Sequence, residues 1–301
     1  MVPSTPRHAL FLRRLSRFTQ TLPGVEAGDV RAVHRMRVAS RRLRELLPVL
    51  QLGQQTAGRL ARRLRKVTRR LGGVRELDVV ALELDELRRR EPGYGRALDV
   101  LEQEARQARD STHAKLLQSG AARELRRIAR KLETVAARVR DDRSPLARRR
   151  WIWAVEARVA RRTALLQLAI DEAGSVYLAE RLHAVRIALK KVRYGVELLC
   201  EGSERPARRA DLVRLRHDQD LLGHLHDLHV LIERVRRAQT SLAPPNLTVW
   251  RDLERISVSL EARCRRLHGQ YVRRRPALSG LCDRLSARTS AVDGGAARRA
   301  G

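Results

Sequence analysis

The chain has 301 residues, of which 64 are Lys or Arg and 34 are Asp or Glu, and its formal net charge is +30. An apolar content of 43% is enough for a hydrophobic core of ordinary size, which argues against wholesale disorder. Such a charge repels itself and attracts polyanions, so the candidate partners are nucleic acid, anionic membrane and inorganic polyphosphate. The chain has only nine Phe, Trp and Tyr residues, whereas proteins that hold single-stranded nucleic acid commonly stack bases on aromatic rings. This scarcity favours polyphosphate.

Cysteine usage and hydropathy indicate the compartment. Cys200, Cys264 and Cys282 are far apart and belong to no paired motif, which is typical of reduced thiols. The stretch Met1 to Arg14 lacks the apolar core of a signal peptide, and no run of 18 apolar residues occurs anywhere. We therefore expect a cytoplasmic protein without a transmembrane segment, and association with a membrane surface stays open.

Apolar residues recur at spacings of three and four through nearly every segment, which predicts an all-α fold. Asp29 is the expected cap of a helix that carries Val33 to Leu52, and Ser144 before a proline is a second start signal. From Ser290 the sequence loses its periodicity, so residues 290–301 are expected to form a disordered tail. About a dozen helices joined by short turns are expected, with breaks at Pro23-Gly24, Gly53, Gly72-Gly73, Pro92-Gly93, Gly120, Ser144-Pro145, Gly174-Ser175, Gly202, Pro206, Gly223, Pro244-Pro245 and Pro276.

Two motifs occur twice in the chain in the same order. The stretch from Val33 to Arg44 recurs at residues 182–193, which is 149 residues later. The stretch from Leu71 to Val79 recurs at residues 222–230, which is 151 residues later. Kept order and spacing predict two copies of one six-helix unit, residues 1–143 and 144–289, packed about a pseudo-two-fold axis.

The first motif carries a stripe of cations on one side of an amphipathic helix. At about 100° per residue His34, Arg37, Arg41 and Arg44 fill an arc of about 80°, and Arg42 lies about 80° to the other side of His34. The stripe lies opposite the apolar face and is ~15 Å long, which suits a row of phosphates. Charges opposite an apolar face are usually only a solvated surface. Like charges at this spacing repel each other, however, which costs free energy. Because both copies carry the same unfavourable arrangement, we favour a ligand that relieves the repulsion. The residues are His34, Arg37, Arg41, Arg42 and Arg44 in the first copy and His183, Arg186, Lys190, Lys191 and Arg193 in the second.

The second motif is expected at a junction between two helices. Free backbone N–H groups there could hold an anion with help from Arg75 or His226, and a simple tight corner is the alternative. Asp78 and Asp227 could accept hydrogen bonds from stripe arginines and hold them in place, and capping or a simple salt bridge is the alternative. Further candidate binding residues are Arg65, Lys66, Arg216 and His217.

Four histidines gather in the second copy and raise the question of a metal site. The aligned residues of the first copy could not ligate a metal in the same way, so we expect no metal. The four are His217, His224, His226 and His229. The sequence also lacks a Ser-His-Asp or Cys-His arrangement, a Walker-type loop and a glycine-rich dinucleotide turn. We therefore expect neither a cofactor nor an enzyme.

At these positions the sequence resembles the CHAD family, the conserved histidine α-helical domains, from about Arg7 to Arg288. The pattern His-x-x-Arg-x-x-x-[Arg/Lys]-[Arg/Lys]-x-Arg occurs twice, Leu-Gly-x-x-x-Asp/Glu-Leu follows each copy, and Arg193-Tyr194 with Glu197 is typical of the family. The resemblance implies two pseudo-symmetric helical bundles around a basic central channel that binds inorganic polyphosphate, often at polyphosphate granules. Ser40 and Glu45 of the first copy depart from their counterparts, so the halves need not bind equally.

The leading hypothesis is a non-enzymatic protein that binds inorganic polyphosphate through both stripes. A sequence-nonspecific nucleic-acid or nucleoid protein is the alternative, which the charge of +30 alone would support. A third class is an accessory protein of phosphate metabolism, whose partner is a kinase or phosphatase.

Overall fold

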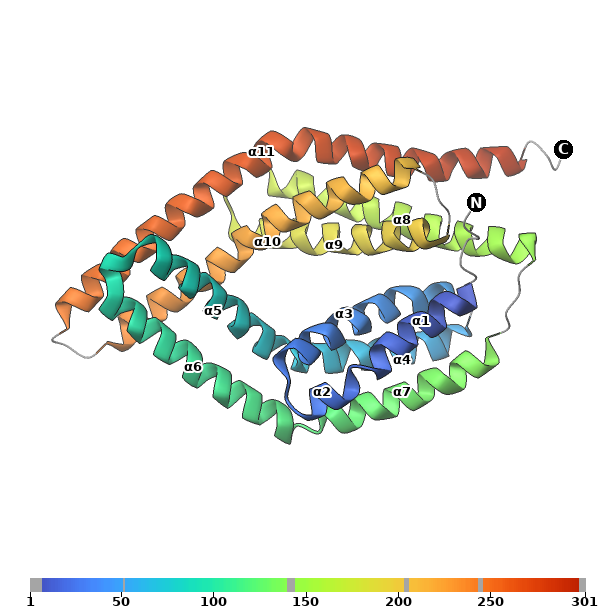
Figure 1. Cartoon of the computed structure of the whole chain (residues 1–301). Coiled ribbons are helices and arrows are strands. Elements are labelled where there is room, and N and C mark those ends of the chain that lie inside the picture. Colours follow the sequence, from blue (N-terminus) through green and yellow to red (C-terminus); the bar gives the residue numbers. More distant parts are fainter. Residues whose placement is uncertain (1–6, 51, 140–143, 203–205, 243–245, 298–301) are drawn as a thin grey trace.

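The structure is a computed structural model that describes residues 7–50, 52–139, 144–202, 206–242 and 246–297. Those residues form helices and no strand, which confirms the predicted all-α fold (Figure 1). The first half contains α1 (Arg7–Thr19), α2 (Leu22–Glu26), α3 (Val30–Leu46), α4 (Gln54–Arg70), α5 (Gly72–Arg90), α6 (Gly95–Gln118) and α7 (Ala121–Arg138). Two short 3-10 helices, η1 (Leu47–Val49) and η2 (Pro92–Tyr94), connect some of them. The second half contains α8 (Pro145–Ala173), α9 (Ala179–Gly202), α10 (Pro206–Ser241) and α11 (Leu247–Ala297).

Two helix starts lie where the sequence predicts them. The Asp29 carboxylate accepts a hydrogen bond of 2.8 Å from the backbone N–H of Arg31 at the start of α3. The Ser144 hydroxyl accepts one of 3.2 Å from the backbone N–H of Ala147 at the start of α8. Both side chains satisfy a backbone donor that the helix itself leaves unpaired.

Several expected helix ends are wrong. The helix predicted to continue to Leu52 ends at Leu46, because Pro48 has no N–H to donate and η1 follows instead. Gly223 lies inside α10 and Pro276 inside α11, where tertiary packing outweighs the unfavourable helix propensity of both residues. The last helix also continues through most of the expected disordered tail to Ala297, since extending an existing helix costs little compared with starting one. Residues 298–301 of that tail lie outside the described residues.

The two halves divide their length differently among helices. In the described residues the first half forms seven α-helices and the second forms four longer ones, so the prediction of two six-helix units is wrong in this respect. Helices α10 and α11 each continue where the first half has a break. The pseudo-two-fold relation of the halves stays a prediction.

Buried side chains form two clusters, and neither follows the expected boundary near residue 143. The larger cluster joins α1 to α4 and α7 to α9 with parts of α10 and α11. The smaller cluster combines α5 and α6 of the first half with α10 and α11 of the second. Figure 1 shows α5 leading away from α3 and α4 towards the C-terminal part of α10 and the N-terminal part of α11, and α6 leading back from there to α7. The halves therefore share their cores.

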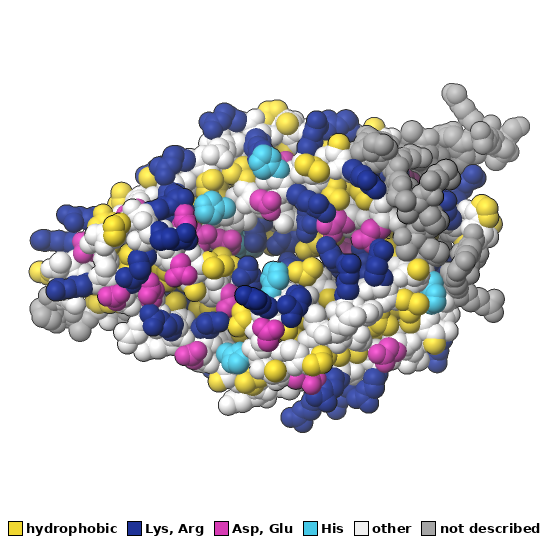
Figure 2. Space-filling model, in the orientation of Figure 1, with side chains coloured by type: hydrophobic (Ala, Val, Ile, Leu, Met, Phe, Trp, Pro, Cys, Tyr) yellow, Lys and Arg dark blue, Asp and Glu magenta, His cyan; other side chains and the backbone are white. Residues whose placement is uncertain are grey.

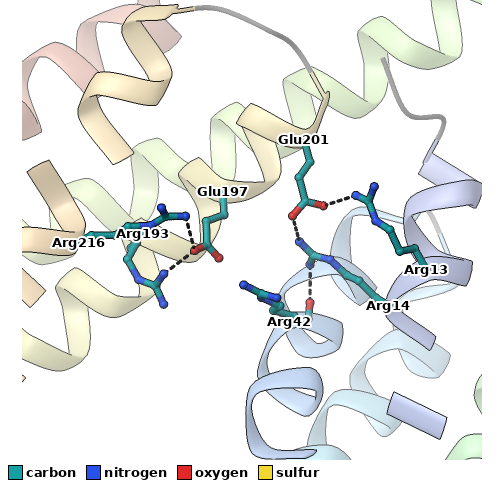
Figure 3. Close-up of polar contacts among 7 residues, drawn as sticks. All are labelled: Arg13, Arg14, Arg42, Arg193, Glu197, Glu201 and Arg216. Atoms are coloured by element: carbon teal, nitrogen blue, oxygen red, sulfur yellow. Dashed lines mark hydrogen bonds and ion pairs between the residues drawn. The ribbon is translucent and has the colours of Figure 1, made fainter. Parts of the chain in front are cut away.

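Buried ion pairs hold α3 beside the second half. Arg14 on α1 is 4% exposed and donates to the Glu201 carboxylate of α9 at 3.1 Å and to the Arg42 carbonyl of α3 at 2.7 Å (Figure 3). Glu45 near the end of α3 forms ion pairs with Arg158 and Arg162 of α8. Such pairs are costly to break when buried, so they fix α3 against α8 and α9.

Candidate functional site

A basic cavity, here called the central cavity, lies between α3 and α5 of the first half and α9 and α10 of the second. Its volume is about 670 Å³. Figure 2 shows this face of the molecule hollowed near its middle, with Lys and Arg side chains gathered around the hollow. Nine of the sixteen predicted binding residues line the cavity: His34, Arg37, Arg41, Arg42, Arg75, Arg186, Lys190, Arg193 and His226.

The wall formed by α3 leaves its guanidinium groups largely unpaired. Arg37 donates one hydrogen bond of 2.8 Å to the carbonyl of Thr68 at the end of α4. Arg41 makes no hydrogen bond or ion pair with any residue that the structure describes. The Nε atoms of Arg37, Arg41 and Arg42 are all buried without a hydrogen-bond partner among the described residues. Buried donors of this kind are costly unless a ligand or water satisfies them.

On the wall formed by α9, Arg193 has several partners within the protein. Arg193 donates to Gln219 of α10 at 2.7 Å and forms an ion pair with Glu197 one turn along α9. Arg216 of α10 approaches the same carboxylate at 3.6 Å (Figure 3). The guanidinium of Arg193 also lies 4.5 Å from the centre of the Tyr194 ring, within the range of a cation–π contact. These contacts fix Arg193 in place before any ligand arrives.

Burial, together with neighbouring positive charge, lowers the pKa values of Arg37, Arg186 and Lys190 in the cavity. Burial, followed by the charges of Arg186 and Arg41, lowers the pKa of Lys190 to about 7. Burial and neighbouring arginines lower the pKa of Arg37 to about 10. Burial also lowers the pKa of Arg186, and the Asp227 carboxylate offsets part of that effect. An anion placed among these groups would remove the repulsion and raise each pKa again.

The two aligned histidines His34 and His183 have different surroundings. His34 is exposed at the cavity, and burial with the charges of Arg75 and Arg41 lowers its pKa. His183 is not among the cavity residues, and its Nδ1 lies 3.2 Å from Nδ1 of His226, which does line the cavity. Burial and the charge of Arg186 lower the pKa of His226 to about 4, so this pair is neutral near pH 7.

Seven predicted residues lie outside the central cavity, and their part in binding stays a prediction. His217 contacts Arg274 on the α11 side of α10, because the residues of one helix face several neighbours. Lys66 lines a separate groove between α4 and α7. Lys191 is exposed. Arg44 and Arg65 lie near each other. Arg216 forms an ion pair with Glu197, and His183 contacts His226.

The second motif gives different structures in the two halves. Gly72 begins α5 and lines the cavity, next to Arg37. Gly223 lies within α10, so the prediction of a free helix start there is wrong: its backbone N–H belongs to a continuous helix. Asp78 forms an ion pair with Arg109 of α6 at 3.1 Å rather than with a stripe arginine.

The site also contains residues that sequence reasoning did not single out. Glu76, Gln219 and Asp220 line the cavity and bring acceptors among the cations. In the sequence Glu197 stands out only as part of the family pattern. Its position four residues after Arg193 is nevertheless the spacing of a helical ion pair, which could have predicted this contact. Across the described ranges, no group of three or more His, Cys, Asp or Glu residues could hold a metal ion.

The fold and this site define an all-helical protein whose two halves build one cationic cavity. The chain matches the family model of the CHAD domain over residues 9–236, and it belongs to the CHAD family. The match ends before α11, whereas the resemblance seen in the sequence was traced to about Arg288. No sequence among curated proteins matches the chain.

Two solved structures share this fold. The CHAD domain from the plant Ricinus communis has a TM-score of 0.58 and 20% identity, and the comparison covers 92% of this chain and 90% of that one. PptA from Streptomyces chartreusis has a TM-score of 0.60 and 17% identity, with 95% and 99% of the two chains covered. In the described part of the chain, no helix is both long and apolar enough to span a membrane.

Proposed function

We propose that this protein binds inorganic polyphosphate in the central cavity and does not catalyse its turnover. Membership of the CHAD family supports this proposal, since that family is associated with polyphosphate. The net charge of +30 supports a polyanionic ligand of some kind. We further propose that the protein associates with polyphosphate granules in the cytoplasm.

The observation that carries the proposal is a set of cavity guanidinium groups with unsatisfied donors. The Nε atoms of Arg37, Arg41, Arg42 and Arg186 are buried and lack a hydrogen-bond partner among the described residues. They belong to helices of both halves and line one cavity. A chain of phosphates offers acceptor oxygens along its whole length, and guanidinium groups bind phosphate with paired hydrogen bonds. A ligand of this kind would satisfy the donors and the charge together.

Nucleic acid is the second candidate, and the charge of +30 favours it. The lining of the cavity argues against bases inside it. Tyr194 is the only Phe, Tyr or Trp among the lining residues. It is buried, and the guanidinium groups of Arg193 and Arg41 lie 4.5 Å and 6.0 Å from the centre of its ring. A base would therefore find no free aromatic face of the kind that single-strand binding proteins use.

A competition titration separates the two ligands. The full chain is loaded with labelled long-chain polyphosphate, and duplex DNA or single-stranded DNA is added at equal phosphate concentration. We expect neither DNA to displace the polyphosphate, and Arg186→Ala to weaken polyphosphate binding. Displacement by DNA at equal phosphate concentration would favour the nucleic-acid hypothesis instead.

Two further measurements bear on the same proposal. Affinity for polyphosphate should fall steeply with salt concentration, because binding releases counterions from the polyanion. Incubation with long-chain polyphosphate should leave the chain length and the free phosphate concentration unchanged over hours. Release of phosphate that depends on the protein would show an enzyme and contradict the non-catalytic part of the proposal.

A further inference from the structure

A second cavity, here called the side cavity, lies on the other side of α3 from the central cavity. It has a volume of about 410 Å³ and lies between α1 and α3. His34, Val38 and Arg42 line both cavities. These three residues are spaced by four along α3, so they form one ridge of the helix, and the two cavities meet along that ridge.

The neighbours of the ridge point to opposite sides. Arg37 and Arg41 lie on the side of the central cavity, whereas Arg35 and Ala39 lie on the side of the side cavity. A helix wheel gives the same division, since residues 37 and 41 and residues 35 and 39 flank the ridge at opposite angles. The cationic surface of α3 therefore continues around the helix.

The side cavity has a simpler charge pattern than the central one. Arg14, Arg17, Arg35 and Arg42 line it, and none of its lining residues is acidic. The lining of the central cavity, in contrast, includes the acidic residues Glu76, Asp220 and Asp227. Unbalanced positive charge beside a shared ridge gives a polyanion a reason to extend across it.

The four arginines of the side cavity are not equally available. The charge of Arg14 is paired with Glu201, and its second hydrogen bond goes to the carbonyl of Arg42. Arg35 forms only an exposed ion pair with Asp29 at 3.5 Å, a type of contact that contributes little. Arg17 is exposed and forms no ion pair with a described residue. Arg42 belongs to the shared ridge and already lines the central cavity, so Arg17 and Arg35 are the additional cations that the side cavity offers a ligand.

We propose that a bound polyphosphate chain crosses the ridge of α3 from the central cavity into the side cavity, where Arg17 and Arg35 bind its far end. The inference rests on the proposed function, because it needs phosphate in the central cavity. It adds a length requirement: only a chain long enough to occupy both cavities gains the second set of contacts. Those contacts then form at a high effective concentration, since the chain is already held.

Isothermal titration of the full chain with triphosphate and with long-chain polyphosphate tests the proposal. We expect the double variant Arg17→Ala with Arg35→Ala to bind the long chain about tenfold more weakly, because each contact between charges at an exposed residue contributes less than a factor of about five. Triphosphate affinity should stay within about twofold of the unaltered protein. The salt dependence of long-chain binding should also fall by about one unit of slope for each lost phosphate contact.

Two controls make the outcomes distinct. The double variant Arg251→Ala with Arg266→Ala on α11 removes the same two charges at exposed residues that line neither cavity, and it should leave both affinities unchanged. Arg186→Ala in the central cavity should weaken both ligands. If the Arg17/Arg35 double variant binds the long chain as the α11 double variant does while Arg186→Ala weakens it, the side cavity is not used and the proposed function stands. Equal losses for triphosphate and the long chain would likewise overturn the length requirement. If the unaltered protein binds no polyphosphate, the proposed function itself fails.

Discussion

The two walls of the central cavity carry similar runs of cations but hold them in different ways. On α3, Arg41 has no polar partner among the described residues, and Arg37 reaches only a backbone carbonyl. On α9, Arg193 is held by Glu197, Gln219 and the Tyr194 ring. One wall thus leaves its donors for a ligand, while the other uses part of its charge to hold its own side chains.

This difference shows that one sequence pattern can serve two physical roles. Arg193 of the α9 wall is preorganised, so a ligand there meets one cation already in position and loses less entropy on binding. Arg186 of the same wall and the arginines of the α3 wall keep unpaired donors that a ligand can satisfy. Variants that affect one wall more than the other should therefore separate stability from binding.

The largest expected effect comes from a substitution that unfolds one wall of the central cavity. Leu43 of α3 and its aligned residue Val192 of α9 are both fully buried on the face opposite the cavity. Leu43→Asp or Val192→Asp places an unpaired carboxylate in the core, which should cost more than about 4 kcal/mol of unfolding free energy. Circular dichroism and thermal melting should show loss of the folded state. A Leu43→Asp variant that melts at the normal temperature would mean that the assignment of buried and cavity faces is wrong.

A sharper comparison is between Arg193→Ala and Arg41→Ala. The first removes the main partner of Glu197, which is 5% exposed, and should lower the unfolding free energy by about 2 kcal/mol because Arg216 compensates only in part. The second removes repulsion and no hydrogen bond or ion pair, only a distant approach of 6.0 Å to the centre of the Tyr194 ring, so its melting temperature should stay the same or rise. Scanning calorimetry measures both. Both variants should still weaken polyphosphate binding.

If Arg41→Ala destabilised the protein as much as Arg193→Ala does, the two arginines would contribute equally to the unfolding free energy. The distinction between the preorganised Arg193 and Arg41 would then be lost. Binding measurements on the same two proteins would decide whether either residue touches the ligand.

A smaller difference concerns pH, since the α9 wall has a titrating lysine where the α3 wall has Arg41. The pKa of Lys190 is about 7 without ligand, well below its ordinary value of 10.5. Phosphate should raise this pKa, so binding takes up a proton above pH 7 and affinity falls as pH rises, by up to about tenfold per unit. Below pH 7 the lysine is already charged, and its contribution becomes constant.

Calorimetry at pH 8 in two buffers of different ionisation enthalpy measures this proton uptake. Lys190→Arg retains the charge but does not titrate in this range, so it should abolish most of the uptake. Uptake that persists in Lys190→Arg would assign the proton to another group. His34 and His183 are poor candidates at this pH because burial lowers their pKa values below 6.5.

The smallest effect distinguishes the two glycines of the second motif. Gly223→Ala should raise the unfolding free energy by about 0.5–1 kcal/mol, because the residue is inside α10 and an added Cβ meets no atom within 4 Å. Gly72→Ala should gain less, since its Cβ would lie 3.1 Å from a guanidinium nitrogen of Arg37. Melting curves compare the two. An equal gain at both positions would show that Arg37 moves away without cost.

Local signals in the sequence predicted local structure well. The caps at Asp29 and Ser144 depend only on a side chain and the backbone a few residues away, and both are confirmed. The all-α fold follows from periodicity and is confirmed as well. Gly223 and Pro276 misled the prediction because their cost is local while the packing that outweighs it is not.

The site could be predicted only in part, for a geometric reason. A helix wheel shows which residues of α3 share a face, and it placed Arg37 and Arg41 correctly in the cavity. It does not show which neighbour a face meets. His183 has the expected angle but turns to His226, and Arg44 lies beyond the end of the cavity near Arg65. The side cavity also depends on where α1 packs, which no spacing within α3 reveals.

The smaller buried cluster has a consequence for the order in which the protein is made. Helices α5 and α6 are complete once Gln118 has been synthesised, but their apolar partners on α10 and α11 extend to Cys264. The ribosome must add 146 more residues, which takes roughly 7 to 30 s at ordinary translation rates. Throughout that interval Val80, Leu84 and Leu87 of α5 have no complete core to enter. The first half of the chain thus leaves the ribosome early and finishes folding late.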